Sequence, residues 1–381
     1  MKLKSLTAFG LAIPFVEAFA HSTKERKVSD AIVVRVETED GSVGYGEGLP
    51  RPYVTGEDRP FVFKVLQEHY WAQLQGKDVP AITGQADLKT LDALLGAPAL
   101  PVGVKASNAA RCAVETALID AGLRSQNMNL SSILPAKRES VTYHGVVTAS
   151  SPESAAKLAK KMKLIGLSQL KVKIGLGDDY ERVKAVAAVM GTAPLRLDAN
   201  ANQSLEDALK TIDLLKEFPI ASIEAPIIPG DHQALKSYTD ACPWDVVVDE
   251  NLLTPNDAKA LAEAGACTVF NVRLSKCGGF YPSLQMIEIA SKYGIKLQIG
   301  AQVGETAILS AAARHLNLAQ EEVLYSEGSF GPLLLTEDVS KERVSFGHRG
   351  LGPTIPGPGS GITVLEERIH KYTQDKMECT S

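Results

Sequence analysis

Charged residues recur at nearly equal intervals through the middle of this 381-residue chain. Lys173, Asp198, Glu224, Asp249 and Lys276 follow one another at spacings of 25, 26, 25 and 27 residues. Each residue ends or follows a short apolar run, and each spacing is the length of one strand plus one helix. The pattern therefore predicts that these side chains lie at similar heights on successive strands of one parallel sheet.

Eight apolar segments are predicted to be the strands of this sheet. They are VTYHGVV (141–147), QLKVKI (169–174), PLRLDA (194–199), IASIEA (220–225), DVVVDE (245–250), TVFNVRL (268–274), IKLQIG (295–300) and EVLYSE (322–327). Helices are predicted between them, several with N-terminal caps, at Ser151, Ser204 and Thr254. This alternation is typical of a β/α barrel. A doubly wound open sheet is the alternative, but no GxGxxG motif opens its first helix.

The flanking segments differ from this alternating region. Residues 1–48 have the pattern of strands, and residues 60–75 and 107–124 have the pattern of helices, the second with Ser107 as a candidate N-cap. We therefore expect an α/β chain with an α+β capping domain over 1–130 and a barrel over 135–330. The Gly/Pro-rich segment 331–381 is expected to return to the capping domain.

Bulk properties narrow the location and the partners of the protein. The first twenty residues resemble a secretory signal, but Pro14 and Glu17 interrupt the apolar run, which favours strands of a cytoplasmic protein. The five cysteines are scattered, as in a reducing compartment. A net charge of −5 without a long basic run disfavours nucleic acid, and no apolar run is long enough to span a membrane. A homo-oligomer is expected.

The spacing of the charges predicts a chemistry. Three carboxylates that point into one cavity would repel one another, so a divalent cation is expected between them. Oxygen ligands favour Mg²⁺, with Mn²⁺ as an alternative. Alternation places Lys171 and Lys173 on one face, and a lysine beside a cation and a second lysine has a lowered pKa. Such a lysine is suited to remove the proton α to a metal-bound carboxylate, giving an enediolate that the metal stabilises.

Five motifs resemble the enolase superfamily, and specifically its muconate lactonizing enzyme subgroup. They are LKVKIG (170–175), RLDANANQS (196–204), SIEAP (222–226), VVDEN (247–251) and RLSKCGG (273–279). The resemblance extends to GYGEGLPRPYVTGE (44–57) and GPLLLTEDV (331–339), and so covers nearly the whole chain. It implies a modified TIM (β/α)7β barrel with an N-terminal capping domain that the C-terminal segment completes.

The resemblance also assigns roles to individual residues. The Mg²⁺ ligands would be Asp198, Glu224 and Asp249, and the residues that orient these ligands would be Asn200 and Glu250. Lys173 and Lys276 would be the acid and base on opposite faces of a small carboxylate substrate, and Lys171 would tune Lys173 or contact the carboxylate. No histidine ends the seventh strand, which disfavours the mandelate racemase subgroup, and His144 is expected to be a core residue.

Substrate contacts are less constrained by the motifs. Dipeptide epimerases of the subgroup have a DxD motif at the eighth strand, which is missing from YSEGSFGPLLL. Segment 331–339 instead resembles muconate cycloisomerases, with Glu327 as a candidate substrate contact. Glu305 is expected to bind an ammonium group, to orient Lys276 or to be a first-turn acid of the next helix. Loops 19–27 and 48–57, with Lys24 and Tyr53, are expected to close over the site; the basic residues of the first loop would bind an anionic group or form a solvated turn.

These features leave three functional hypotheses. The first is a Mg²⁺-dependent isomerase, either a racemase or epimerase or a cycloisomerase of the muconate lactonizing type. The second is a lyase of the same subgroup, such as a dehydratase or an o-succinylbenzoate synthase, because the proton-abstraction step is shared. The third is a barrel that binds a ligand without catalysis, which the presence of both Lys173 and Lys276 disfavours.

Overall fold

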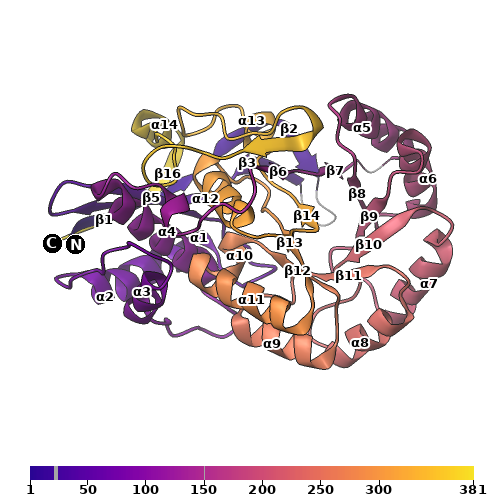
Figure 1. The fold of residues 1–381 in the computed structure, drawn as a ribbon, viewed down its shortest axis with the longest axis horizontal. Helices are drawn as coiled ribbons and strands as arrows, with labels where there is room; N and C mark the ends of the chain where they lie inside the picture. Colours follow the sequence, from indigo (N-terminus) through magenta and orange to yellow (C-terminus); the bar gives the residue numbers. More distant parts are fainter. Residues whose placement is uncertain (21–24, 150) are drawn as a thin grey trace.

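The parallel sheet predicted between residues 141 and 327 forms a barrel in the computed structural model, which describes residues 1–20, 25–149 and 151–381 (Figure 1). Within these residues the sheet has eight strands in sequence order, and neighbouring strands are parallel. The strands are β7 (Gly145–Val147), β8 (Leu170–Lys173), β9 (Leu195–Asp198), β10 (Ile220–Glu224), β11 (Asp245–Val248), β12 (Val269–Val272), β13 (Lys296–Ile299) and β14 (Tyr325–Ser326). The predicted barrel is confirmed.

The first strand, predicted as one element over 141–147, is wrong in one respect. The chain forms two short strands there, because it changes partners between Tyr143 and His144. The N–H of Tyr143 donates to the carbonyl of Gly350 at 2.8 Å, which continues the pairing of β6 (Ser140–Thr142) with β15 (Leu351–Pro353). Only β7 belongs to the barrel.

His144 joins the first strand of the barrel to the last strand. Its backbone N–H donates to the carbonyl of Ser326 at 2.9 Å, and its ring Nδ1 accepts from the N–H of Ser326 at 3.2 Å. Burial lowers the pKa of His144 to about 4, so the ring is neutral and serves as an acceptor. The polar groups of His144 are therefore satisfied within the protein, as expected, although the residue is only partly buried.

Helices surround the barrel and follow its strands. They are α5 (Pro152–Leu164), α6 (Asp179–Met190), α7 (Leu205–Leu215), α8 (His232–Ala241), α9 (Pro255–Ala264), α10 (Leu274–Cys277), α11 (Phe280–Tyr293) and α12 (Ala307–Leu318). The predicted caps are confirmed, because Ser151, Ser204 and Thr254 each accept a backbone N–H from the first turn of α5, α7 and α9. In the described part of the chain, no helix combines the length and the apolar character needed to cross a membrane.

A second sheet forms the cap beside the barrel. It is antiparallel, in the order β16-β1-β4-β5, with β1 (Leu3–Leu11), β4 (Ile32–Thr38), β5 (Val43–Gly48) and β16 (Thr373–Thr380). The cap helices are α1 (Arg59–Val65), the π-helical η1 (Leu66–Trp71), α2 (Ala72–Leu74), α3 (Asp87–Leu95) and α4 (Asn108–Ser125), and the 3₁₀ turn η2 (Leu130–Ser132) follows. Pairing of β16 with β1 places the two chain ends side by side (Figure 1).

Glycines allow α4 to pack directly on β5. A Cβ atom at Gly44, Gly46 or Gly48 would lie 2.1–2.2 Å from a backbone atom of α4, so only glycine fits at these alternate positions. Ser107 occupies the N-cap position of α4 but its side chain makes no capping bond, contrary to prediction. Glu57, in the loop between β5 and α1, has a longer side chain and accepts from the N–H groups of Ala109 and Ala110 instead.

The C-terminal segment and a hairpin cover the mouth of the barrel. The segment contains α13 (Gly331–Leu334), the 3₁₀ turn η3 (His348–Gly350) and α14 (Glu366–Tyr372), and the hairpin consists of β2 (Ile13–Ala20) and β3 (Glu25–Ser29). The N–H of Thr336 donates to the carbonyl of Pro14 at 2.9 Å, and Phe15 pairs with Leu335. The hairpin is therefore fixed to the chain that follows the last barrel strand.

Two buried glutamates tie the cap to the barrel. Glu115 of α4 accepts from the backbone N–H groups of Phe280 and Tyr281 at the start of α11. Glu47 of β5 accepts from the side chain of Thr306 at 2.7 Å and from its N–H at 2.8 Å, at the start of α12. Unpaired N–H groups and the helix dipole favour a carboxylate at both places.

Gly279 lies directly beside the Glu115 carboxylate, and its replacement is expected to destabilise the protein. Gly279 has φ +103° and ψ −163°, and a Cβ atom there would lie 1.9 Å from Oε2 of Glu115. Gly279→Ala is therefore expected to lower the free energy of unfolding by about 3 kcal/mol, measured by urea unfolding. Gly294→Ala is the control, because Gly294 also has positive φ but has nothing near its Cβ position. Equal losses in the two variants would contradict the role of the clash.

Candidate active site

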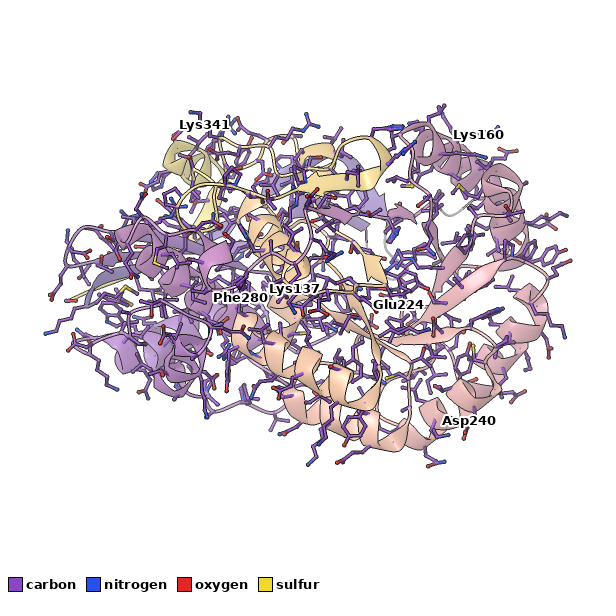
Figure 2. All side chains as sticks on the ribbon, viewed as in Figure 1. Lys137, Lys160, Glu224, Asp240, Phe280 and Lys341 are labelled. Atoms are coloured by element: carbon purple, nitrogen blue, oxygen red, sulfur yellow. The ribbon has the colours of Figure 1, made fainter. Side chains whose placement is uncertain are left out.

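The predicted charged residues gather at the carboxyl ends of the barrel strands. Glu224 lies inside the ring of strands, whereas Lys160 and Asp240 project outward from the surrounding helices (Figure 2). These ends surround a cavity of about 290 Å³, which the cap residues Arg51, Tyr53 and Val54 also line. Cavities for small ligands start at about this size. The site is therefore matched to a small molecule enclosed between barrel and cap.

Lys171 points inward from β8 and is surrounded by carboxylates. Its Nζ lies 3.0 Å from Oε2 of Glu224, 2.9 Å from Oε2 of Glu327 and 3.4 Å from Oδ2 of Asp198. Burial lowers the pKa of Lys171, but the three carboxylates raise it further, so the net shift is upward. Lys171 is therefore a fixed positive charge rather than a base.

Lys173 is two residues further along the same strand and has a different environment. Its Nζ donates to Oδ1 of Asn200 at 2.7 Å and lies 4.0 Å from the nearest oxygen of Asp198. Burial lowers the pKa of Lys173, the charge of Asp198 opposes this shift, and the positive charges of Lys171 and Arg273 reinforce it, so the net shift is downward. Two lysines of one strand thus have pKa values shifted in opposite directions, and Lys173 is the one suited to accept a proton.

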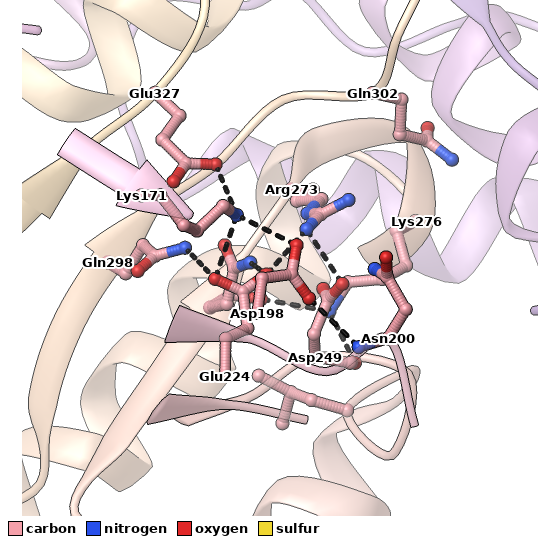
Figure 3. A network of polar contacts seen from close by, with 12 residues as sticks. Lys171, Asp198, Asn200, Glu224, Asp249, Arg273, Lys276, Gln298, Gln302 and Glu327 are labelled. Carbon is pink, nitrogen blue, oxygen red and sulfur yellow. Dashed lines mark hydrogen bonds and ion pairs between the residues drawn. The ribbon is translucent and has the colours of Figure 1, made fainter. Parts of the chain in front are cut away.

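The three predicted metal ligands end or follow adjacent strands. Asp198 ends β9, Glu224 ends β10 and Asp249 follows β11, and their side chains are at most 3% exposed. Figure 3 shows them together with the lysine and arginine side chains that lie between them. The N–H of Asn200 donates to Oδ1 of Asp198 at 3.0 Å and so holds that ligand in place.

The donor set has the chemistry of a divalent-cation site. Buried carboxylates need positive charge nearby. Oε2 of Glu250 is buried without a hydrogen-bond partner, whereas Oδ1 of Asp249 lies 3.0 Å from the ammonium of Lys276. Both are carboxylate oxygens of the kind that a divalent cation binds. As they stand, however, no three Asp, Glu, His or Cys side chains of the described residues surround a common metal position. The residues fit Mg²⁺ in kind, and binding requires a local rearrangement.

Lys276 reaches the site from α10, directly after β12. Its Nζ donates to the carbonyls of Asp249 at 2.7 Å and Asn271 at 2.8 Å, and lies 3.0 Å from Oδ1 of Asp249. The side chain is only 2% exposed and lines the cavity. Lys173 and Lys276 therefore reach one cavity from the strands that flank the three carboxylate-bearing strands.

The two residues predicted to orient the ligands differ in what they contact. Asn200 bonds both Asp198 and Lys173, so it connects a predicted ligand to the predicted base. Glu250 lines the cavity beside Asp249, and burial, followed by the charges of Asp249 and Asp198, raises its pKa to about 8.

Glu327 lines the cavity, but both of its oxygens have partners in the protein. Oε2 accepts from Lys171 at 2.9 Å and Oε1 accepts from Arg196 at 2.8 Å. A substrate contact through this carboxylate would require one of these bonds to break. Glu327 therefore holds Lys171 in place, and the positive charge of Arg196, deeper in the barrel, balances the charge of the carboxylate.

Glu305 is a buried carboxyl group at the end of the seventh strand. Oε1 accepts from the N–H of Gln302 at 2.6 Å, whereas Oε2 is buried without a partner and the residue lines the cavity. Burial raises the pKa of Glu305 from its ordinary value of 4.5 to about 8. The neutral form is therefore favoured in the folded protein.

This raised pKa makes stability depend on pH. Because the folded pKa exceeds the unfolded one, the contribution of Glu305 is fully present below pH 4.5 and is lost as pH rises through about 8. Glu305→Gln keeps the neutral form, so the fall in Tm between pH 5 and pH 9 is expected to be smaller by several degrees. Glu263→Gln, an exposed change on α9, is the control. Parallel Tm profiles for all three proteins would contradict the assignment.

The loops predicted to close over the site are partly described. Lys24 lies outside the described residues. Tyr53 lines the cavity with half of its surface exposed, and the guanidinium of Arg26 lies 5.9 Å from its ring centroid. Arg26 pairs with Asp30 at 2.7 Å, so its charge is already balanced within the protein.

Several polar residues inside the barrel were missed by sequence reasoning. Arg196, Asn271 and Gln298 are buried on β9, β12 and β13 and bond the site carboxylates. Arg273, directly after β12, contacts both Glu224 and Asp249. A signal was present, since a polar residue inside a buried strand is as unusual at these positions as at Lys171.

Comparison with known proteins agrees with this geometry. Residues 9–134 match the N-terminal domain of the mandelate racemase / muconate lactonizing enzyme family, and residues 154–368 match the enolase C-terminal domain-like family. The chain belongs to the enolase superfamily, in its muconate lactonizing enzyme subgroup. The fold and enzyme class predicted from the sequence are thereby confirmed: the protein is an isomerase that acts on a small carboxylate.

Individual relatives cover nearly the whole chain. An L-Lys-D/L-Arg epimerase of Methylococcus capsulatus is 30% identical over 90% of this chain and 93% of its own. A muconate cycloisomerase 1 of Rhodococcus opacus is 29% identical over 96% of both chains. The structure of a dipeptide epimerase of Cytophaga hutchinsonii, complexed with Mg and D-Ala-L-Val, superposes with a TM-score of 0.87 at 25% identity, over 99% of this chain and 100% of the other.

Proposed function

We propose that this chain is a Mg²⁺-dependent racemase or epimerase, in which Lys173 and Lys276 exchange the proton on the carbon next to a substrate carboxylate. The observation that carries this proposal is the placement of two lysines at one small cavity, from strands that flank three buried carboxylates. Proton transfer on two faces of one carbon needs such a pair.

The two lysines have complementary surroundings for this exchange. Lys173, whose pKa is shifted downward by burial, is the base of the pair, and the lone pair of its neutral amine takes the α-proton. Two backbone carbonyls and Asp249 hold the ammonium of Lys276, which delivers a proton to the opposite face. One proton leaves and one returns, so the composition of the substrate is unchanged and its configuration inverts. In the reverse direction the two lysines exchange roles.

The predicted ligands Asp198, Glu224 and Asp249 would hold the metal. When bound, Mg²⁺ supplies positive charge beside the substrate carboxylate and stabilises the charge that develops there. The similarity to an epimerase whose structure contains Mg supports this choice. Mn²⁺ is an alternative, because it accepts the same oxygen ligands.

The substrate is proposed to lack a distal ammonium group. After β14 the cavity is lined by Glu327, Gly328, Ser329 and Phe330, and both oxygens of Glu327 are already bound by Lys171 and Arg196, so this segment presents no free carboxylate to a cation. The hydroxyl of Ser329 already accepts from Arg314 at 2.8 Å. N-acylated amino acids are therefore expected to be better substrates than free dipeptides. Cycloisomerisation of a muconate is the second candidate, which the similarity to muconate cycloisomerase 1 supports.

Product analysis tests the proposal. The protein is incubated with Mg²⁺ and a panel of N-acylamino acids, dipeptides and muconates, and products are resolved by chiral chromatography and mass spectrometry. Inverted configuration with unchanged mass is the expected result for at least one N-acylamino acid. Loss of one water would identify a lyase, and an unchanged panel would count against the proposal.

Three sequence predictions stay proposals. We propose that the cap region 1–130 supplies the specificity loops for the barrel region 135–330, with 331–381 completing the cap. Reduced cysteines of the described chain suit a cytoplasmic location. Association into a homo-oligomer is tested by sedimentation.

A further inference from the structure

Glu224 already has a donor at each of its lone-pair positions. Oε1 accepts from Asn271 at 3.1 Å and from Arg273 at 2.8 Å. Oε2 accepts from Lys171 at 3.0 Å and from Gln298 at 2.9 Å. An ionised carboxylate has about four such positions. A metal ion can therefore bind Glu224 only if one of these four donors leaves.

The four donors are not equally free to leave. Asn271 and Gln298 are completely buried on β12 and β13, and Lys171 is buried on β8 and also bound to Glu327. Arg273 follows the end of β12, lines the cavity and has a side chain that is 17% exposed. Lys171 also lines the cavity, but its side chain is only 3% exposed and has a second carboxylate partner, so Arg273 is the donor with the most room to leave.

Arg273 also occupies a second proposed ligand. The Nη2 that contacts Glu224 lies 2.7 Å from Oδ2 of Asp249, so a single nitrogen bridges the two carboxylates. Figure 3 shows the guanidinium among the carboxylates. The guanidinium of Arg273 therefore supplies positive charge to the same carboxylates that a metal ion would bind.

The position of the Arg273 side chain is built into the barrel. A Cβ atom at Gly300, the residue after β13, would lie 3.1 Å from both Cγ and Nε of Arg273. The absence of a side chain at Gly300 thus leaves space for the arginine stem. Nε of Arg273 is buried without a hydrogen-bond partner, so this position is not fully satisfied and leaving it costs less.

We propose that Arg273 is a positioning residue that closes the metal site, and that a divalent cation binds by displacing its guanidinium from Glu224 and Asp249. The proposal rests on the ligand set of the proposed function. Arg273 then sets both the affinity for the metal and the stability of the metal-free protein. The exchange replaces one positive charge by two, and the displaced guanidinium enters the cavity that it already lines.

Calorimetric titration of metal-free protein with Mg²⁺ and Mn²⁺ tests this competition. Arg273→Met removes the guanidinium, so metal is expected to bind at least about 10-fold more tightly, because no buried ion pair must first be broken. The metal-free variant is expected to have a lower Tm than the wild type, and saturating Mg²⁺ is expected to narrow the difference. Lys296→Met is the matched control. It removes a positive charge at the end of the barrel opposite to the cavity, where Lys296 begins β13 and pairs with Asp245.

The outcomes separate this proposal from the ligand assignment. A wild-type protein that binds metal, with an Arg273→Met variant that binds equally or more weakly, would overturn the displacement. A wild-type protein that binds neither metal would instead refute the proposed ligands. A measurement on the wild type covers the case of a variant that does not fold: the Arg273 Nε–H resonance, assigned by its loss in Arg273→Lys, is expected to shift on addition of Mg²⁺. An unmoved resonance at saturation would also overturn the proposal.

Discussion

Replacement of Lys276 with alanine is expected to abolish epimerisation while leaving proton exchange on one face of the substrate. Lys173 would still remove the α-proton from the epimer that presents it, and solvent deuterium would return to the same face. The opposite epimer would lose exchange by about 10³-fold, within the usual contribution of general acid–base catalysis. Lys173→Ala is expected to give the mirror-image result. Deuterium uptake by each epimer, followed by NMR, measures both effects.

The control for the two lysine variants is Lys184→Ala, an exposed change on the outer helix α6. It is expected to leave exchange of both epimers at the wild-type rate. Full epimerisation by Lys276→Ala would contradict the two-base assignment. Equal loss of exchange from both epimers in both variants would indicate a shared structural role, and unfolding curves of the variants distinguish that case.

Asp249→Asn is expected to weaken Mg²⁺ binding by at least about 100-fold. Groups that merely orient a metal ligand are worth 10–100-fold in affinity, and Asp249 is proposed to be a ligand itself. Its Oδ1 lies 3.0 Å from Nζ of Lys276 and its Oδ2 lies 2.7 Å from Nη2 of Arg273, so this carboxylate already attracts positive charge, which a neutral asparagine amide would not do. Calorimetric titration with Mg²⁺ measures the loss. The change is opposite in sign to that expected for Arg273→Met, although both residues lie in the same ion pair.

Asp245→Asn provides the matched control for this experiment. Asp245 begins β11 at the opposite end of the barrel and pairs with Lys296 at 2.8 Å, so its removal is expected to leave Mg²⁺ affinity unchanged. An Asp249→Asn variant that titrates like the Asp245→Asn control would show that Asp249 is not a ligand.

Features that depend on local pattern were predictable from the sequence. The alternation of apolar strands and capped helices predicted the barrel, because each strand and each cap needs only residues close in sequence. The equal spacing of Lys173, Asp198, Glu224 and Asp249 placed them at one end of the barrel, since successive units of a barrel repeat the same geometry.

Features that depend on distant partners were not predictable. The break at His144 follows from bonds to Gly350 and Ser326, roughly two hundred residues away along the chain. The capping of α4 by Glu57 rather than Ser107 likewise depends on where a loop folds back.

The buried polar layer below the site was predictable in part. The period of two that drew attention to Lys171 applies equally to Arg196, two residues before Asp198 on β9. Which carboxylate each side chain would bond could not be read from one sequence, because those bonds cross between strands. The bridging position of Arg273 is of the same kind.

Deuterium exchange by the wild-type protein tests the central claim most directly. The protein is placed in D₂O with an N-acylamino acid panel, once with Mg²⁺ and once with excess chelator, and the α-proton signals are followed by NMR. The proposed function predicts that deuterium replaces the α-proton of at least one carboxylate with Mg²⁺ present, with both configurations appearing, and that the chelator stops the exchange. Retention of every α-proton in the presence of Mg²⁺, or exchange that continues unchanged under chelation, would contradict it.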